Sequence, residues 1–231
     1  MRFHWFVPFA LLIPASALAL SPVTLCPGQQ VAPMADGRML GHLPYPEANA
    51  ADLVAVPGNF GVSRPCQLHQ DAAKALNALL SAAEKVPAVK GRLRGVSCFR
   101  SIARQREVFC SQIGPTKRCA NATERAKSSA PGGFSEHATG YTLDFGIRPL
   151  TKACGDVSNC IALTQPGQWL LAHAPEFGFE LSFPAGNAQG VTWEPWHWRW
   201  VGKTSTQPGA AKARAIFRAA RSRFPAHPVV S

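Results

Sequence analysis

Two histidines and an aspartate supply the side-chain types that can hold a catalytic zinc ion: His137, Asp144 and His197. A set of three protein ligands leaves a fourth position for water, and zinc lowers the pKa of such a water from about 15.7 towards 7. Hydrolysis of a peptide bond would also require a carboxylate that takes a proton from this water and passes it to the leaving amine. Glu194 stands three residues before His197 and can face the same cavity, whereas Pro195 between them excludes an ordinary helix.

Each of these residues also has an ordinary structural interpretation. A single histidine is more often a packed or surface residue than a ligand, and Asp144 could be a hydrogen-bonded carboxylate in a strand. The tryptophans that alternate around His197 could form a core face and its cover. Glycine and small residues around His137 favour the zinc hypothesis, because the backbone must pass close to a ligand. We assign structural roles to the remaining histidines of the mature chain: His42, His69, His173 and His227.

Three segments contain most of the residues that could do chemistry, and they resemble the motifs of a known family. The first runs from Ser97 to Ser101 and is followed by Gln105, the second from Ser135 to Asp144, and the third from Glu194 to Gly202. In order and separation they resemble the VanY-type zinc D-alanyl-D-alanine carboxypeptidase family, which is related to VanX and to L-Ala-D-Glu endolysin peptidases. The resemblance covers roughly residues 67–203.

The family patterns match these segments residue by residue. The pattern S-x-H-x-x-G-x-x-x-D matches from Ser135 to Asp144, and E-P-W-H-x-R-[aromatic]-V-G matches from Glu194 to Gly202. The pattern S-G-Y-R-S matches the first segment with two substitutions, Cys98 and Phe99. Neither substitution removes an expected ligand or the expected catalytic carboxylate, so the resemblance still implies an active enzyme.

The resemblance implies a role for each matching residue. Glu194 would be the general base and acid, and Arg100 would polarise the scissile carbonyl and stabilise the oxyanion that develops on it. Arg199 is expected either to have a structural role or to support the site residues from behind, without a chemical step of its own. The implied zinc ligands are His137, Asp144 and His197, and the implied substrate-binding residues are Ser135, Gln105 and Trp196.

The implied activity is zinc-dependent hydrolysis of the terminal D-Ala-D-Ala bond of peptidoglycan stem peptides. L,D-carboxypeptidases and L-Ala-D-Glu endopeptidases act on the same polymer with very similar motifs, so both stay open as alternatives. An alternative of another class is a non-catalytic zinc- or cell-wall-binding protein. Storage of zinc would not require Glu194 and Arg100 beside the ligands, which favours an enzyme.

The elements that must position these residues follow from hydrophobic spacing. The pattern predicts helices over residues 67–86, 102–112 and 167–176, and strands over 93–99, 140–147, 179–183 and 193–201. Their irregular alternation indicates an α+β fold, a single compact domain with a small mixed or antiparallel sheet flanked by helices. The family resemblance makes this fold Hedgehog/DD-peptidase-like. Residues 114–133 are expected to form a long loop.

The chain divides into four predicted parts. Residues 1–19 are predicted to be a signal peptide, with Arg2, an apolar stretch from Phe6 to Ile13 and a cleavage site at Ala17-Leu18-Ala19. Residues 20–65 would form an irregular N-terminal segment packed on the catalytic domain, and residues 66–203 the zinc peptidase domain. Residues 204–231 would form a basic C-terminal helix and tail. We therefore expect an exported protein, periplasmic or secreted, with no stable membrane span after signal cleavage.

Cysteine usage also favours export. The seven cysteines lie after the predicted signal peptide, and none forms a C-x-x-C pair, so disulfides in an oxidising compartment are the better interpretation. Closeness in sequence suggests two pairs, Cys110 with Cys119 and Cys154 with Cys160. Pairing Cys26 with Cys66 would leave Cys98 free, and Cys66 with Cys98 is a serious alternative.

The charge balance is basic, with 24 Lys and Arg against 13 Asp and Glu, a formal net charge of +11. The basic residues are scattered except between Lys203 and Arg223, where apolar residues among them indicate an amphipathic helix. An exported protein meets the anionic cell wall, so we expect peptidoglycan peptides as partners and no nucleic acid.

Overall fold

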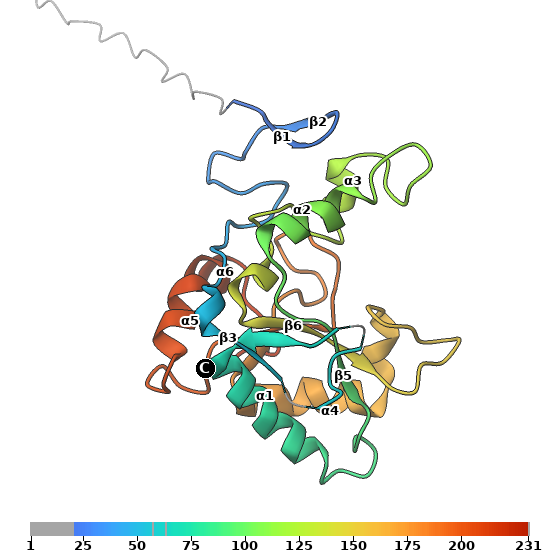
Figure 1. The fold of residues 1–231 in the computed structure, drawn as a ribbon, viewed down its shortest axis with the longest axis vertical. Helices are drawn as coiled ribbons and strands as arrows, with labels where there is room; N and C mark the ends of the chain where they lie inside the picture. The colour runs from blue at the N-terminus through green and yellow to red at the C-terminus, as the bar shows by residue number, and fades with distance from the viewer. Residues whose placement is uncertain (1–20, 57, 63, 231) are drawn as a thin grey trace, which may run out of the picture.

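The computed structural model describes residues 21–56, 58–62 and 64–230, so the predicted signal peptide at 1–19 lies outside the described residues. Six α-helices are described (Figure 1): α1 (Gln70–Ala83), α2 (Ile102–Cys110), α3 (Ala122–Ala126), α4 (Gln165–His173), α5 (Ala210–Ile216) and α6 (Arg218–Arg223). The described strands are β1 (Val23–Cys26), β2 (Gln29–Val31), β3 (Leu53–Ala55), β4 (Gln67–His69), β5 (Leu93–Ser97), β6 (Thr142–Ile147), β7 (Phe179–Leu181) and β8 (His197–Trp200). Short 3-10 helices are η1 (Ala50–Asp52), η2 (Glu136–Thr139), η3 (Asn159–Leu163) and η4 (Ala174–Phe177). None of the described helices combines the length and apolar character that crossing a bilayer requires.

The central sheet has four antiparallel strands in the order β5-β6-β8-β7. Every residue of β6 is buried, because the sheet is covered on both faces. Successive side chains of a strand point to opposite faces. Leu143 and Phe145 therefore enter the main core, and Asp144 points to the other face. This architecture confirms the predicted α+β fold with an antiparallel sheet.

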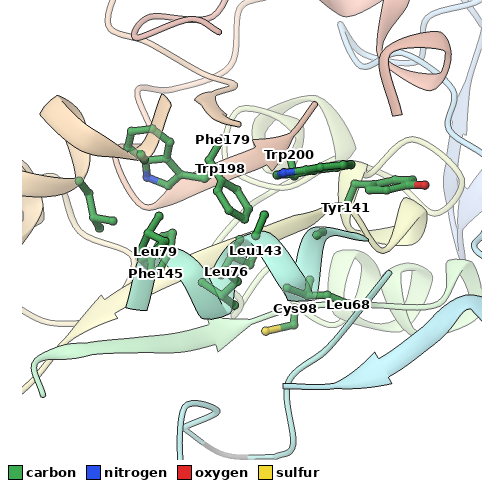
Figure 2. Packing of buried hydrophobic residues seen from close by; sticks show 14 of the residues in the cluster. Leu68, Leu76, Leu79, Cys98, Tyr141, Leu143, Phe145, Phe179, Trp198 and Trp200 are labelled. Atoms are coloured by element: carbon green, nitrogen blue, oxygen red, sulfur yellow. The ribbon is translucent and has the colours of Figure 1, made fainter. Parts of the chain in front are cut away.

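The main core lies between α1 and the sheet. Figure 2 shows Leu76 and Leu79 of α1 close to Leu143, Phe145 and Trp198 of the strands. All five side chains are fully shielded from solvent, and each contributes about 1.5–3 kcal/mol through the hydrophobic effect. The helical spacing of apolar residues in α1 and the alternation along β6 and β8 thus create one apolar layer. This layer supports the sheet from one side, and Asp144 lies on the other side.

Several predicted elements have different ends in the structure. The helix predicted over 67–86 begins at Gln70, since Gln67–His69 is β4 and pairs with β3. The last strand begins at His197 and not at Trp193, because a turn that includes Pro195, which has no backbone N–H, precedes it. The prediction of an unbroken loop over 114–133 is wrong, since α3 forms inside it and Asn121 caps its first turn.

The basic C-terminal segment forms two helices and not the one predicted. The chain leaves helical geometry at Phe217, between α5 and α6. This residue is fully buried, and its ring centroid lies 5.7 Å from that of Tyr45. The bend therefore fixes the C-terminal helices to the core through an apolar anchor.

Two of the predicted disulfides are wrong. The structure pairs Cys26 with Cys110, Cys66 with Cys98, and Cys154 with Cys160, and Cys119 is a buried free cysteine. The pair Cys154–Cys160 and the alternative Cys66–Cys98 are thus confirmed. Cys110 does not bond to its sequence neighbour Cys119, because α2 packs against β1 and brings the distant Cys26 to it.

The N-terminal segment 20–65, which was predicted to be irregular, contains the β1–β2 hairpin, η1 and β3. Figure 1 shows the hairpin near α2 and α3, at the end of the molecule away from α1. Further along, the Tyr45 amide donates to the Gly133 carbonyl at 2.9 Å and the Ala48 amide to the Ala138 carbonyl at 2.7 Å. These bonds attach the segment beside η2. The division of the chain into four parts stays a prediction.

Candidate active site

One cavity of about 650 Å³ contains all eight residues that the sequence singles out. Its wall is assembled from the segment after β5, from η2, from β6 and from the turn before β8, together with α3 and part of the N-terminal segment. Segments far apart in the chain thus converge on one space. The predicted site residues on its wall are Arg100, Gln105, Ser135, His137, Asp144, Glu194, Trp196 and His197.

The sheet register and a tight turn place the three expected metal ligands. Asp144 on β6 is paired directly with His197 on β8, so the two side chains lie side by side on one face. His137 comes from η2, whose first turn is capped by the Ser135 hydroxyl. Gly140 ends η2 with a φ of 73°, and a Cβ there would lie 2.8 Å from the Leu53 side chain. Only glycine can make this turn into β6 without strain.

The geometry of His137, Asp144 and His197 fits a metal ion. One ligand atom from each lies within 4.8 Å of the others, and all three residues are buried. His137 Nε2 lies 3.2 Å from Asp144 Oδ2, and His197 Nδ1 lies 2.9 Å from Asp144 Oδ1. Two imidazoles and a carboxylate are common ligands of zinc.

The second nitrogen of each imidazole is held by the protein. His137 Nδ1 donates to the Cys98 carbonyl at 2.8 Å, since a carbonyl oxygen can only accept. His197 Nε2 donates to Glu136 Oε2 at 3.1 Å. Because these nitrogens donate outwards, the lone pairs of His137 Nε2 and His197 Nδ1 can both face a metal ion beside Asp144.

Glu136 is a site residue to which the sequence analysis assigned no role. Its carboxylate contacts His197 and also accepts hydrogen bonds from Arg199 Nη1 at 2.8 Å, from Ser182 Oγ at 2.6 Å and from Tyr45 Oη at 3.2 Å. Arg199 in turn donates to Glu180 Oε1 at 2.8 Å. The signal in the sequence was an ionisable residue between Ser135 and His137, but its partners lie far away in the chain.

Burial and charge pairing act against each other in this cluster. Burial raises the pKa of Glu136, but Arg199 and His197 outweigh it and hold that pKa well below its usual range. The pKa of Asp144 is likewise lowered, since His137 and His197 overcome the effect of burial. Burial lowers the pKa of His197, yet its hydrogen bonds to Asp144 and Glu136 raise it to about 10. The position between the two carboxylates thus strongly favours a positive charge, from a proton or from a metal ion.

Glu194 has a different environment from the other carboxylates. Its Oε2 lies 3.8 Å from His197 Nδ1, and no hydrogen bond to its side chain is found among the described residues. Burial raises the pKa of Glu194 to about 8, and the negative charges of Asp144 and Glu136 add to this effect. A carboxyl group whose pKa lies near neutrality can both take and release a proton, as a general base and acid must.

Arg100 is oriented towards the same cavity by two neighbours. Its Nη1 donates to Gln105 Oε1 at 2.7 Å and its Nη2 to Ser97 Oγ at 2.6 Å. Gln105 Nε2 is itself bonded to the Ala130 carbonyl at 2.6 Å, so the amide of Gln105 is held on both sides. In the structure Gln105 therefore positions Arg100, and its predicted role in substrate binding stays a prediction.

Ser135 and Trp196 both reach the cavity wall. Ser135 is buried, and its hydroxyl accepts from the His137 amide at 3.4 Å. Trp196 is half-buried and packs against the main core. Their predicted roles in substrate binding also stay predictions. The Cys66–Cys98 disulfide ties the chain just before Arg100 to the residue that precedes β4, and so restricts the backbone that carries this arginine.

Comparison with known proteins identifies the family. Residues 65–203 match the family described as VanY: D-alanyl-D-alanine carboxypeptidase, and the chain belongs to this family. The resemblance inferred from the three motifs is thereby confirmed.

Two curated relatives match parts of the chain. Carboxypeptidase YodJ of Bacillus subtilis (strain 168) is 30% identical over 165 residues, which is 68% of this chain and 56% of YodJ. A D-alanyl-D-alanine carboxypeptidase of Enterococcus faecium is 35% identical over 79 residues, which is 33% of this chain and 23% of that enzyme. The chain thus spans less than two thirds of the length of each relative.

Solved structures share the fold. The LD-carboxypeptidase LdcB superposes with a TM-score of 0.58 at 25% identity, covering 77% of each chain. The D,D-dipeptidase VanXYg, solved with a D-Ala-D-Ala phosphinate analog, has a TM-score of 0.52 at 21% identity over 74% of this chain and 63% of that one. A VanY D,D-pentapeptidase solved with Zn(II) has a TM-score of 0.50 at 19% identity, over 78% of this chain and 94% of that one.

Proposed function

We propose that this protein is an exported zinc carboxypeptidase that hydrolyses the terminal D-Ala-D-Ala bond of peptidoglycan stem peptides. The observation that carries the proposal is the convergence of a buried His-Asp-His group, a carboxyl of raised pKa and an oriented arginine in one cavity. Membership of the VanY family and the D-alanyl-D-alanine carboxypeptidase relative of Enterococcus faecium support the choice of substrate.

Zinc would be held by His137 Nε2, the Asp144 carboxylate and His197 Nδ1, because both ring nitrogens lie next to the Asp144 oxygens, at 3.2 Å and 2.9 Å. When bound, zinc supplies a Lewis acid that polarises the scissile carbonyl and acidifies the attacking water. Glu136 and the Cys98 carbonyl hold the two imidazole rings in the orientation that binding requires.

Glu194 would move the proton. Its carboxylate takes a proton from the attacking water, and its pKa near neutrality allows it to return that proton to the nitrogen of the leaving D-alanine. Arg100 would donate to the carbonyl oxygen, where negative charge grows during the reaction. Because Gln105 and Ser97 hold the guanidinium in advance, little reorganisation is needed when that charge develops.

A second candidate is an L,D-carboxypeptidase, which removes the D-alanine that follows an L-centre. The similarity to LdcB favours it, with 25% identity and a TM-score of 0.58. The L-Ala-D-Glu endopeptidase and the non-catalytic binding protein stay alternatives without an observation that favours them.

Mass spectrometry of defined muropeptides incubated with the zinc-loaded protein tests the proposal. We expect loss of one terminal D-alanine from a pentapeptide, with the tetrapeptide left intact. Cleavage of the tetrapeptide with the pentapeptide untouched would instead establish the L,D activity. If the zinc-loaded protein cleaves no stem peptide, the hydrolase proposal is wrong.

A further inference from the structure

Arg125 on α3 is a second buried arginine on the wall of the cavity. Only 7% of the residue is exposed, and its Nε is buried without a hydrogen-bond partner among the described residues. Its terminal nitrogens donate to two uncharged oxygens over long distances, 3.3 Å to Ser128 Oγ and 3.4 Å to the Val108 carbonyl. The guanidinium therefore retains donor capacity that the protein does not use.

Arg125 also lacks a counter-ion among the described residues. The acidic residue beside it on α3, Glu124, is turned away, and its Oε2 accepts from the Ala120 amide at 2.7 Å. The carboxylates that line the cavity are Asp144, Glu194 and Glu136. Asp144 and Glu136 hydrogen-bond to His197, and Glu194 lies beside the same ring.

The nearby positive charges make this position still less favourable for a cation. Burial lowers the pKa of the Arg125 guanidinium, and Arg118 and Arg100 lower it further, while Cys119 and Glu194 act in the opposite direction. A buried cation without a partner carries a desolvation cost that a bound anion can offset. The part of the cavity wall that contains Arg125 and Arg118, called the arginine end below, is therefore suited to an anion that arrives with the substrate.

The geometry of α3 holds Arg125 at this wall. Asn121 accepts from the Glu124 amide at 2.9 Å, and the Ala122 amide donates to Gln29 Oε1 of β2 at 2.8 Å. Since the Cys26–Cys110 disulfide joins the β1–β2 hairpin to α2, the hairpin, α2 and α3 form one braced unit. The position of Arg125 is thus set before a ligand binds.

We propose that Arg125 forms an anionic subsite that pairs with a carboxylate of the peptide substrate. This inference rests on the proposed function, and it adds that the preferred substrate is an acidic peptide. The two terminal nitrogens of a guanidinium can donate to the oxygens of one carboxylate, and those of Arg125 are held only by the long bonds to Ser128 and Val108. The carboxylate comes either from the C-terminus of the residue that leaves or from an acidic residue that precedes the scissile bond.

The subsite is tested by a double-mutant cycle in which one change is a substitution of Arg125 and the other is an amidation of the peptide. Steady-state kinetics of the zinc-loaded protein are measured for Arg125→Gln and Arg125→Lys with three peptides: the free acid, its C-terminal amide, and the peptide amidated at its internal carboxylates. Against the free acid we expect Arg125→Gln to raise KM by about ten- to a hundredfold, the loss of one charged hydrogen-bonded contact. The effect falls on KM and not on kcat, and Arg125→Lys restores part of the affinity.

In the wild type, amidation of the carboxylate that Arg125 contacts should raise KM relative to the free acid. In Arg125→Gln the same amidation should no longer raise KM, and this loss identifies the carboxylate. The matched control is Arg118→Gln, which removes the same charge from an exposed position of the same cavity. It should change KM for all three peptides by one small, salt-sensitive factor. Thermal melting of each variant separates these effects from a loss of folded protein.

Failure of this proposal and failure of the proposed function give different results. The wild type could cleave the free acid while Arg125→Gln raises KM equally for all three peptides or for none of them. In that case the proposed subsite is wrong and the proposed function stands. If the wild type cleaves none of them, calorimetric titration of the zinc-loaded protein with the same peptides still measures the subsite. Equal affinity of wild type and Arg125→Gln for the free acid would then overturn it.

Discussion

Charge is handled in opposite ways at the arginine end of the cavity and at its metal end, the part of the wall that contains His137, Asp144, His197 and Glu136. At the metal end, Glu136 lies between His197 and Arg199, and Arg199 also contacts Glu180, with each of these contacts between 2.8 and 3.1 Å. At the arginine end, Arg125 is almost as deeply buried, yet none of the described carboxylates pairs with it.

This difference distinguishes two kinds of buried charge: those whose partners are other protein groups, and those whose partner is a ligand. A buried network of paired charges holds its members in one geometry, because removing any member leaves another charge uncompensated. Arg199 belongs to such a network through its two carboxylate partners, although its Nη2 has no hydrogen-bond partner among the described residues. An unpaired buried charge stabilises nothing in the free protein, and its value lies in the partner that it can bind. The predictions below probe this contrast.

The largest effect is expected from Glu194→Gln at the metal end. Since Glu194 moves the proton and does not hold the metal, the substitution should lower kcat by about 10²- to 10⁴-fold. Zinc affinity, measured by competition with a chelator, should stay within a few-fold of the wild type. Full activity in this variant would show that another group transfers the proton.

Replacing each buried arginine by leucine compares the two ends directly. Arg199→Leu leaves Glu136 and Glu180 buried without their main partner, so the free energy of unfolding should fall by about 3–5 kcal/mol. Arg125→Leu removes an unpaired cation, and the free energy of unfolding should stay within about 1 kcal/mol of the wild type or rise. Urea unfolding measures both variants. Equal destabilisation would mean that Arg125 has a structural role and that the contrast between the two ends is wrong.

Glu136→Gln tests how the paired network serves the metal. The amide keeps the size of the side chain but holds the His197 ring less firmly, so zinc affinity should fall by about 10- to 100-fold. Chelator competition gives this affinity without reference to turnover. Ser182→Ala, which removes another hydrogen bond to Glu136 and leaves its carboxylate in place, is the control. Unchanged zinc binding in Glu136→Gln would restrict Glu136 to a role in folding.

The smallest effect concerns His42, which donates to the Ala126 carbonyl next to Arg125 at 2.7 Å. Burial lowers the pKa of His42 to about 4, although Glu136 and the Ala126 carbonyl act against this shift. An unfolded histidine titrates near 6.5. Between about pH 4 and pH 6.5 the unfolded chain therefore binds more protons at His42 than the folded chain does. The contribution of His42 to the free energy of unfolding is complete above about pH 6.5 and is lost as the pH falls towards 4.

We therefore expect His42 to account for a loss of about 1–2 kcal/mol in unfolding free energy between pH 6.5 and 5. The variant His42→Gln should lack this part of the pH dependence. Urea unfolding at several pH values checks it, with a chelator present so that release of zinc does not contribute. Parallel pH profiles for the wild type and the variant would contradict the assigned pKa shift.

Much of the fold and most of the candidate site could be predicted because their signals are local. The alternation in β6 and β8 predicted strands, and it separates Asp144 from Leu143 and His197 from Trp198 within each strand. The cross-strand register, which the fold sets, then places Asp144 and His197 side by side. The motifs also singled out Glu194 and Arg100, which reach the same cavity. The ends of elements were less well predicted, since a single pairing such as β4 with β3 overrides helical spacing at Gln67.

The sequence by itself determined the set of chemical groups and the order in which the chain presents them. Only the tertiary structure decided which groups become partners, since partners such as Tyr45 and Glu136 or Cys26 and Cys110 lie far apart in the chain. For the same reason the sequence could not distinguish the paired Arg199 from the unpaired Arg125. Both are arginines next to apolar residues, and their difference arises from burial and from the distance to a carboxylate, which exist only once the segments have packed together.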